Sequence, residues 1–180
     1  MNMQVLFSTD EREKIMNYLL YNPSKEINLN EIARQVKVSP GQVHKYVSIL
    51  RKLGIVKSNF LKESPLVNSL RLTQNLVFIE KKKIVKKLKK GIPEIKGIGV
   101  YGSWAKGTNY EDSDLDVWIK IEKTPSDKNL YELKKEIEKS SKVAVDLMAL
   151  TPEKLLHLKE KSESFYFSLF DTIHLWGESL

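Results

Sequence analysis

The sequence predicts an α+β protein of two small domains, the first helical (residues 1–73) and the second built on a short mixed sheet (residues 74–180). Two patterns support this division. Apolar residues recur at helical spacing over residues 10–53, whereas short apolar runs alternate with helical stretches beyond residue 96. The net charge also changes along the chain, from +5 over residues 1–73 and +6 over the next 23 residues to −4 over the remainder. A basic front and an acidic back indicate two tasks, contact with a polyanion and carboxylate chemistry.

Composition narrows the class of protein. The 180 residues are 41% hydrophobic and 29% charged, as in a folded soluble protein. No apolar stretch approaches the roughly 18 residues that cross a bilayer, and the N-terminus lacks the features of a signal peptide. Cysteine is absent, which excludes disulfides and thiolate metal sites. We therefore expect a cytoplasmic protein with no membrane partner. The basic front can equally be a solvated, lysine-rich surface.

Three helices are predicted in the first domain. The first begins at Asp10-Glu11, where acidic side chains favour a helix N-terminus, and stops at Asn22-Pro23. The second is short, with Asn30 as its expected N-cap. The third begins at Ser39-Pro40, an N-cap followed by proline at the first helical position, and ends at Gly54. Two short helices and a longer third in this order indicate a helix-turn-helix.

The tight segment Lys37-Val38 joins the second helix to the third. The run LNEIARQVKVSPGQVHKYVSILRKLGIV, residues 29–56, resembles the winged-helix regulators of archaea and bacteria. The resemblance covers about residues 8–73 and implies a winged helix-turn-helix. Its two wing strands would be Ile55-Val56 and residues 70–72, with residues 59–68 as the loop between them. Many such domains bind DNA, and others serve only in protein interactions.

Polar and basic side chains occupy the third helix on the side away from its apolar stripe. The candidate DNA-binding residues are Gln42, His44, Lys45, Ser48, Arg51 and Lys52. The first four could reach base edges in a major groove, whereas the last two, with Lys57, could contact phosphates. The alternative is an ordinary solvated helix face.

A lysine-rich helix is predicted over residues 74–91, ending at Gly91 ahead of Pro93. Seven lysines lie between Lys81 and Lys90. They could form a phosphate-binding strip. They could equally be the solvated face of an amphipathic helix that opens the second domain.

A paired-carboxylate motif follows the first strand of the second domain. The short strand around residues 98–100 leads to Gly102-Ser103. These two small residues let the backbone approach a bound phosphate, and the free N–H groups at the start of a following helix can hold it. Ten residues separate Ser103 from Asp114, which forms an Asp-x-Asp pair with Asp116. Residues two apart in a strand share a face, so both carboxylates point together. They repel each other unless a cation lies between them, and hard oxygen ligands suit Mg²⁺.

A third carboxylate, Asp146, stands in the middle of the apolar run of residues 143–150. An ionised group in such a strand is costly without a cation or a hydrogen-bond donor beside it. If this strand lies next to that of Asp114 and Asp116, the three carboxylates converge. Two metal ions could then be held together.

The pattern of Gly-Ser, spacer, Asp-x-Asp and distant Asp resembles the DNA polymerase beta superfamily, in particular its minimal nucleotidyltransferases. The similarity covers about residues 74–180, with Ile173–Gly177 as the last strand. It implies a small α/β nucleotidyltransferase domain with a short mixed sheet. Such an enzyme moves a nucleoside monophosphate from an NTP to an acceptor, and we expect AMP from ATP.

Roles for individual residues follow from this resemblance. Asp114 and Asp116 would bind two Mg²⁺ ions, and Asp146 would complete the site of the catalytic ion. Gly102 and Ser103 would contact the triphosphate. Lys106 stands where many relatives have arginine, so it could neutralise a phosphate without forming a bidentate fork.

Other side chains of the second domain are given ordinary roles. We expect Trp104 and Trp118 to pack in the core rather than to stack on a base. The carboxylates of Glu111 and Asp112 fall in a predicted loop and need not be ligands. Asp171 is expected to be structural.

Two functions stay open. One is a Mg²⁺-dependent nucleotidyltransferase with a DNA-binding winged helix, which as an antitoxin would modify a partner toxin. The other is a transcription regulator that senses nucleotide without turnover. Because the sequence ends at residue 180, we expect the acceptor to dock on the winged helix, on a second copy of the chain in a homodimer, or on another protein.

Overall fold

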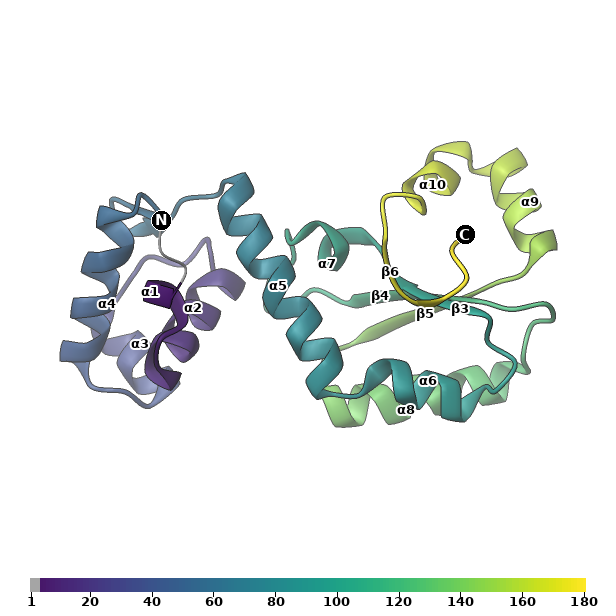
Figure 1. The fold of residues 1–180 in the computed structure, drawn as a ribbon, viewed down its shortest axis with the longest axis horizontal. Coiled ribbons are helices and arrows are strands. Elements are labelled where there is room, and N and C mark those ends of the chain that lie inside the picture. Colours follow the sequence, from purple (N-terminus) through teal and green to yellow (C-terminus); the bar gives the residue numbers. More distant parts are fainter. Residues whose placement is uncertain (1–3) are drawn as a thin grey trace. The chain divides into compact units, whose positions relative to one another are not determined.

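The structure, a computed structural model, describes residues 4–180 and the side chains of residues 6–180. It divides into two compact units, of which the first ends at Arg71 and the second comprises Leu72–Leu180. The first unit is a group of helices with a small hairpin, and the second is a four-stranded sheet covered by helices (Figure 1). None of the described helices combines the length and the hydrophobicity required of a bilayer-spanning segment.

Short helices and a hairpin make up the first unit. Its elements are α1 (Gln4–Phe7), α2 (Asp10–Tyr21), α3 (Leu29–Val36), α4 (Pro40–Lys52), β1 (Val56–Lys57), β2 (Phe60–Leu61) and the first turns of α5 (Pro65–Lys81). Between α3 and α4 the chain turns at Lys37, whose backbone is left-handed with φ 57°. The predicted helix-turn-helix is therefore present.

Side-chain caps set the helix starts in this unit. Ser39 forms a reciprocal capping box with Gln42 at the start of α4, as its Ser-Pro signature indicates. For α3 the predicted N-cap, Asn30, is wrong. Asn28 is the cap, because its side-chain oxygen lies 3.1 Å from the amide nitrogens of both Asn30 and Glu31.

The wing is shorter than predicted. β1 and β2 pair antiparallel directly after α4. The second strand expected over residues 70–72 and the loop expected over residues 59–68 are wrong, because α5 already begins at Pro65. Val67, Leu70 and Arg71 are three and four residues apart, so a helix buries all three on one face.

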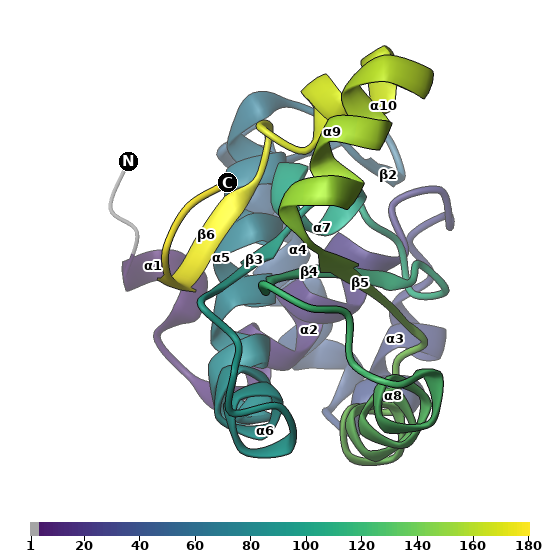
Figure 2. The same ribbon diagram turned by 90° about the vertical axis from the view of Figure 1, so that its right-hand side faces the viewer.

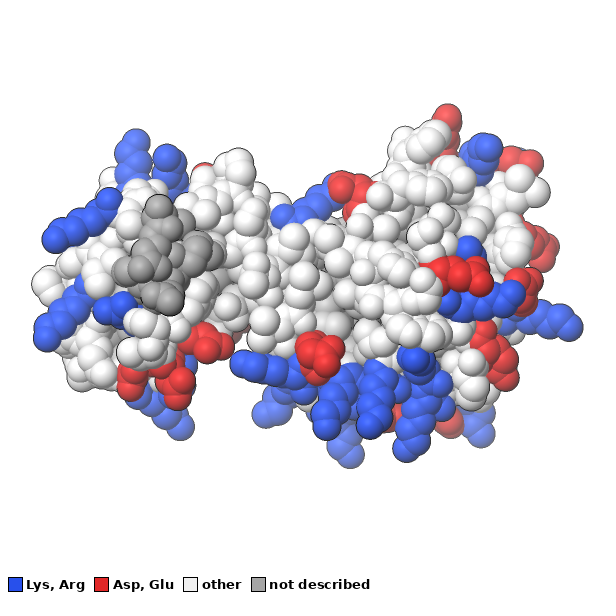
Figure 3. All heavy atoms as spheres, viewed as in Figure 1, with Lys and Arg blue, Asp and Glu red and all other residues white. Residues whose placement is uncertain are grey.

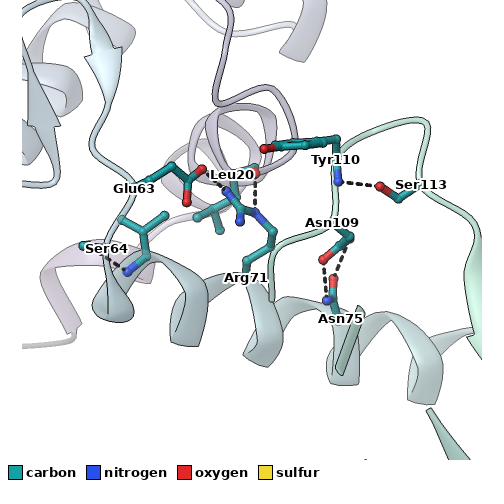
Figure 4. A network of polar contacts seen from close by, with 9 residues as sticks. Leu20, Glu63, Ser64, Arg71, Asn75, Asn109, Tyr110 and Ser113 are labelled. Atoms are coloured by element: carbon teal, nitrogen blue, oxygen red, sulfur yellow. Dashed lines mark hydrogen bonds and ion pairs between the residues drawn. The ribbon is translucent and has the colours of Figure 1, made fainter. Parts of the chain in front are cut away.

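Arg71 ties the start of α5 to the rest of the first unit. Its side chain is fully buried, and its Nε donates a hydrogen bond to the carbonyl of Leu20 at 2.5 Å. Its Nη2 lies 2.9 Å from Glu63 Oε1 (Figure 4). A buried guanidinium is tolerated only when paired in this way.

The lysine-rich segment expected as one helix over residues 74–91 forms parts of two. α5 ends at Lys81, and α6 (Ile84–Gly91) starts after Lys83, which is left-handed with φ 55°. Ile79 and Ile84 are both buried in the core of the second unit. Five residues apart, they would point roughly 140° away from each other on a straight helix. The break lets both reach the same core.

A mixed sheet organises the second unit. Its further elements are β3 (Gly97–Val100), α7 (Gly102–Lys106), β4 (Leu115–Lys120), α8 (Asp127–Ser141), β5 (Val145–Leu150), α9 (Pro152–Lys161), α10 (Glu163–Ser168) and β6 (Ile173–Gly177). The strand order is β5-β4-β3-β6, in which β4 and β5 are parallel and β3 is antiparallel to both its neighbours. The predicted short mixed sheet and its last strand, Ile173–Gly177, are both confirmed.

Helices cover both faces of this sheet. α6 and α8 lie on one face, whereas α9 and α10 lie on the other (Figure 2). Trp118 of β4 is fully buried on the second face, across the strand from Gly99. A Cβ atom on Gly99 would lie 2.3 Å from the indole ring. Trp104 is 4% exposed, so both tryptophans are confirmed as packing residues.

The close approach of Gly99 to Trp118 leads to a prediction about stability. Gly99→Ala should lower the free energy of unfolding by about 1–3 kcal/mol, because the added methyl group overpacks a filled core. Thermal or urea unfolding followed by circular dichroism measures the change. Gly41→Ala is the matched control, since a Cβ there meets nothing within 4 Å. Equal effects of the two substitutions would contradict the packing described.

Candidate active site

The candidate carboxylates lie on neighbouring parallel strands. Asp116 of β4 is paired in register with Asp146 of β5. Asp114 directly precedes β4, two residues from Asp116, and therefore shares its face of the strand. Asp114 and Asp146 are exposed, whereas Asp116 is partly buried. The structure thus brings together the three carboxylates that the sequence singles out.

Negative charge at this place is not balanced by the protein. Burial and, after it, the neighbouring charges of Asp146 and Asp114 together raise the pKa of Asp116 to about 6. Within the described part of the chain, the carboxylate of Asp116 has no hydrogen bond or ion pair. A partly buried carboxylate beside two others is a group that needs a cation.

Gly102 makes room for this carboxylate. Its φ of 65° is left-handed, and a Cβ atom there would lie 2.2 Å from Asp116 Oδ2. Any other residue would therefore be strained and would displace Asp116. Gly102 also begins α7, whose N-terminus has no side-chain cap. The N–H groups of its first turn, next to the partly exposed Ser103, stay available for an anion.

Tyr101 is a residue of the site that the motif analysis missed. Its hydroxyl donates a hydrogen bond to Asp146 Oδ2 at 3.0 Å, and its ring packs edge-on against Phe165 of α10 at 6.2 Å. Burial and the charge of Asp146 raise the pKa of the Tyr101 hydroxyl. The phenol therefore stays protonated and holds one oxygen of Asp146. Its position just before Gly102-Ser103 is the signal that could have identified it.

A buried amide pair orders the spacer between Ser103 and Asp114. Asn75 Nδ2 donates to Asn109 Oδ1 at 2.8 Å and to the carbonyl of Trp104 at 2.9 Å, and Asn109 Nδ2 donates back to Asn75 at 3.3 Å (Figure 4). Both asparagines are almost fully buried. The pair fixes the loop that leads to Asp114. An asparagine within a predicted helix carries no sequence signal of this role.

Lys106 lies at the C-terminal end of α7 and already has a partner. Its Nζ is 2.7 Å from Asp171 Oδ2, and the two side chains are 49% and 67% exposed. The sequence indicates only a structural role for Asp171. An ion pair this exposed contributes little to stability, so Lys106 can exchange Asp171 for another anion. Glu111 and Asp112 are exposed in the turn before Asp114.

The carboxylates of Asp114, Asp116 and Asp146 are ligands of the type that binds magnesium. Hard carboxylate oxygens with uncompensated charge are what Mg²⁺ binds. In the conformation described for residues 4–180, no group of three His, Cys, Asp or Glu side chains has the geometry of a metal site. Ligation would therefore require side-chain rotation of the exposed pair, Asp114 and Asp146.

The candidate DNA-binding residues all lie on α4, but they differ in the hydrogen bonds that they form within the protein. Gln42 belongs to the capping box. Arg51 Nη2 donates to Asn59 Oδ1 at 3.2 Å, which links the helix to the turn of the wing. The side chains of His44, Lys45 and Lys52 are exposed and form no hydrogen bond or ion pair among the described residues. Ser48 is partly exposed and donates to the carbonyl of His44 at 2.9 Å.

Comparison with known proteins identifies both units. Residues 82–166 match the model of the polymerase beta nucleotidyltransferase family, and residues 12–57 match that of winged helix-turn-helix DNA-binding domains. MJ1215 of Methanocaldococcus jannaschii, an inferred protein adenylyltransferase, is 35% identical over 72 residues, which are 38% of this chain and 84% of that protein. The chain belongs to the polymerase beta nucleotidyltransferase family. It is a nucleotidyltransferase with an N-terminal winged helix.

Solved structures similar to this nucleotidyltransferase include toxin-antitoxin complexes. One, with AMP-PNP, is 26% identical with a TM-score of 0.44 and covers 53% of this chain and 72% of that one. Another contains the tri-AMPylated HEPN toxin of Shewanella oneidensis with its MNT antitoxin. It is 20% identical with a TM-score of 0.39, covering 62% of this chain and 73% of that one.

The raised pKa of Asp116 predicts how stability depends on pH without metal. The carboxyl group titrates at about 6 in the folded protein, against 3.8 for the unperturbed group. Its contribution to stability is therefore full below about pH 4 and is lost as pH rises through about 6. Asp116→Asn removes this titration. In EDTA, the difference between the melting temperature of Asp116→Asn and that of the original protein should increase by about 3 °C in favour of the variant between pH 4 and pH 7.

Calorimetry or circular dichroism across that pH range makes the measurement. Asp112→Asn, the same change at an exposed loop position, is the control. A constant difference between Asp116→Asn and the original protein at all pH values would contradict the crowding of charge described at β4 and β5.

Proposed function

We propose that this nucleotidyltransferase transfers AMP from ATP to a side-chain hydroxyl of a protein in a Mg²⁺-dependent reaction, and that its winged helix binds DNA. One observation carries the catalytic part. Asp116 and Asp146 are in register on parallel strands beside Asp114, and no cation of the described chain is bonded to them. This is a site built for metal ions that accompany a triphosphate.

In this proposal the three carboxylates hold two Mg²⁺ ions. Asp114 and Asp116 would be ligands of both ions, and Asp146 would be a further ligand. When bound, the ions neutralise the triphosphate and favour the deprotonated acceptor hydroxyl. Tyr101 acts as a positioning residue, since its hydrogen bond restrains one oxygen of Asp146 and leaves the other to the site.

The triphosphate would be bound at the start of α7. Gly102 lets the backbone approach closely, the uncapped N–H groups face the phosphates, and the Ser103 hydroxyl adds a donor. Lys106 would leave Asp171 to neutralise a phosphate oxygen. The short distance from this turn to Asp116, evident in the 2.2 Å between the carboxylate and a Cβ placed on Gly102, brings the phosphates to the carboxylates.

The reaction is an in-line displacement at the α-phosphorus. The acceptor oxygen forms a bond to phosphorus, the bond from the α-phosphorus to the bridging oxygen breaks, and pyrophosphate leaves with the bonding electrons. The hydroxyl proton passes to a carboxylate of the site or to water. Catalysis of this kind depends on positioning and charge neutralisation rather than on a covalent intermediate.

A protein acceptor is supported by two observations. The similar M. jannaschii protein is named for adenylyl transfer to proteins. Large apolar side chains also stand exposed on and just after α10, where Phe167 and Phe170 are more than half exposed, and Phe165 of the same helix packs on Tyr101. Aromatic side chains are enriched in protein interfaces. A partner toxin is one acceptor of this class.

Transfer of labelled nucleotide tests the catalytic proposal. Purified protein with Mg²⁺ and α-labelled ATP, offered a cell extract, should label a protein band. Asp114→Asn and Asp116→Asn should each reduce labelling at least about 100-fold, because each removes a metal ligand. Asp112→Asn should leave it unchanged. Persistent labelling by Asp116→Asn would overturn the site. ATP binding without transfer would favour the regulator that senses nucleotide, and label on RNA would change the acceptor class.

Binding of promoter fragments tests the winged helix. Lys45→Ala should weaken DNA binding by roughly 3- to 10-fold, because a phosphate or base contact is lost. Nucleotide transfer should be unaffected by this change. Fluorescence anisotropy with labelled duplexes from the gene's own upstream region makes the measurement, with Lys154→Ala on α9 as the control. Equal affinities for the two variants would argue against DNA contact through α4.

A further inference from the structure

Positive charge is concentrated on and just before α6, within the nucleotidyltransferase unit. Residues 81–90 contain seven lysines and no acidic residue. We call six of them the lysine strip; they are Lys82, Lys83, Lys86, Lys87, Lys89 and Lys90. In the described part of the chain, none of the six forms an ion pair with a carboxylate. Figure 3 shows blue atoms gathered along the face below α6.

Two other helices of the same unit do not share this pattern. On α8, lysines alternate with glutamates and pair with them, as Lys128 does with Glu132 and Lys134 with Glu138. On α9, lysines are likewise interleaved with Glu153 and Glu160. Mixed charge of that kind is what a solvated helix face requires. Beside the lysine strip, Glu80 lines the same hollow as Lys83, Lys86 and Lys89, but the six lysines far outnumber it, so solubility alone does not account for the strip.

The fold holds several of these ammonium groups in place. Lys82 donates to the carbonyl of Ser140 at 3.2 Å, and Lys87 donates to the hydroxyl of the same residue. Lys89 Nζ lies 3.8 Å from the centroid of the Trp176 ring. Like charges held side by side repel one another and attract anions from solution. Three of the six ammonium groups of the strip are therefore held in place by the fold, and the other three add positive charge beside them.

The absence of large exposed apolar residues near the lysine strip, in the part of the chain that the structure describes, indicates which kind of anionic partner it binds. None of the large hydrophobic residues that stand exposed in the described structure lies between residues 81 and 96. A protein interface needs a buried apolar anchor and is poor in lysine. A membrane-bound helix needs a free apolar face, whereas Ile84 and Leu88 of α6 are fully buried in the core. Positive charge is the remaining feature by which this surface could recognise a partner. Positive charge is sufficient to bind the phosphodiester backbone of a nucleic acid.

We infer that the lysine strip binds the phosphate backbone of a nucleic acid, independently of base sequence. The contact belongs to the nucleotidyltransferase unit and is separate from the base-reading residues of α4. Lysine suits the role because it acts as a point charge toward phosphates. The inference does not depend on AMP transfer, since the strip lies on α6 and the carboxylates lie at the ends of β4 and β5.

A charge-matched pair of variants tests the inference. The strip variant carries Lys83→Gln, Lys86→Gln and Lys90→Gln. The control variant carries Lys154→Gln, Lys159→Gln and Lys161→Gln on α9, which removes the same charge from exposed positions of the same unit. Both are made in the full chain with Lys45→Ala and Lys52→Ala, which weaken contacts through the winged helix.

Binding to a random-sequence DNA duplex of about 30 base pairs is measured at roughly 50 to 200 mM salt. The strip variant should bind at least about tenfold more weakly at low salt than the control. Its plot of log affinity against log salt should be less steep by about two to three units. Equal affinities and equal slopes for the two variants would overturn the inference. Unchanged melting temperatures show that both variants are folded.

Lysine footprinting gives an independent readout. Acetylation of the unmodified protein, read by mass spectrometry, should be slowed by the duplex at Lys83, Lys86 and Lys90 but not at Lys154 or Lys159. A second arm with an RNA duplex of the same length shows which nucleic acid the strip prefers, and protection by either supports the inference. Protection by neither duplex would refute it and would favour an acidic protein as the partner.

Discussion

The repulsion among Asp114, Asp116 and Asp146 is the constraint around which the catalytic unit is arranged. Register pairing of β4 with β5 places two of these carboxylates side by side, and burial makes Asp116 costly to ionise. No lysine or arginine of the described chain relieves this charge. A fold carrying such a cluster is stabilised by a cation that binds it, so in the proposed function affinity for metal would be obtained at the expense of stability without metal.

The surrounding residues preserve this arrangement rather than neutralise it. A glycine at position 102 leaves the space that the Asp116 carboxylate occupies. A tyrosine hydroxyl, which is neutral, is the only protein donor bonded to Asp146 among the described residues. The nearest cation on α7, Lys106, is held by Asp171 instead. Charge of the opposite sign is collected on α6, where its lysines cannot quench the carboxylates. One small unit thus keeps an anionic centre and a cationic surface apart.

Much of the fold could be predicted because its signals are local. The capping box at Ser39, the turn at Lys37 and the alternation of Leu115, Val117 and Ile119 each depend on neighbours within a few residues. The Gly-Ser and Asp-x-Asp spacing indicated the strand of the candidate carboxylates for the same reason. Errors arose where two local patterns competed. Residues 70–72 suit a strand by composition, but the spacing of Val67 and Arg71 makes them one face of a helix.

By itself, the sequence determined the helix-turn-helix, the paired carboxylates and the basic-to-acidic change of charge, since composition, periodicity and motif spacing carry this information. The resemblance of its Gly-Ser and Asp-x-Asp pattern indicated the family. Only the tertiary structure decided which groups meet across the chain. It placed Asp146 beside Asp116, Tyr101 on Asp146, Asn75 on Asn109, and Lys106 on Asp171. Such contacts join residues up to 65 positions apart, as in the Lys106 pair. They depend on strand register and helix packing, which no local window of sequence contains.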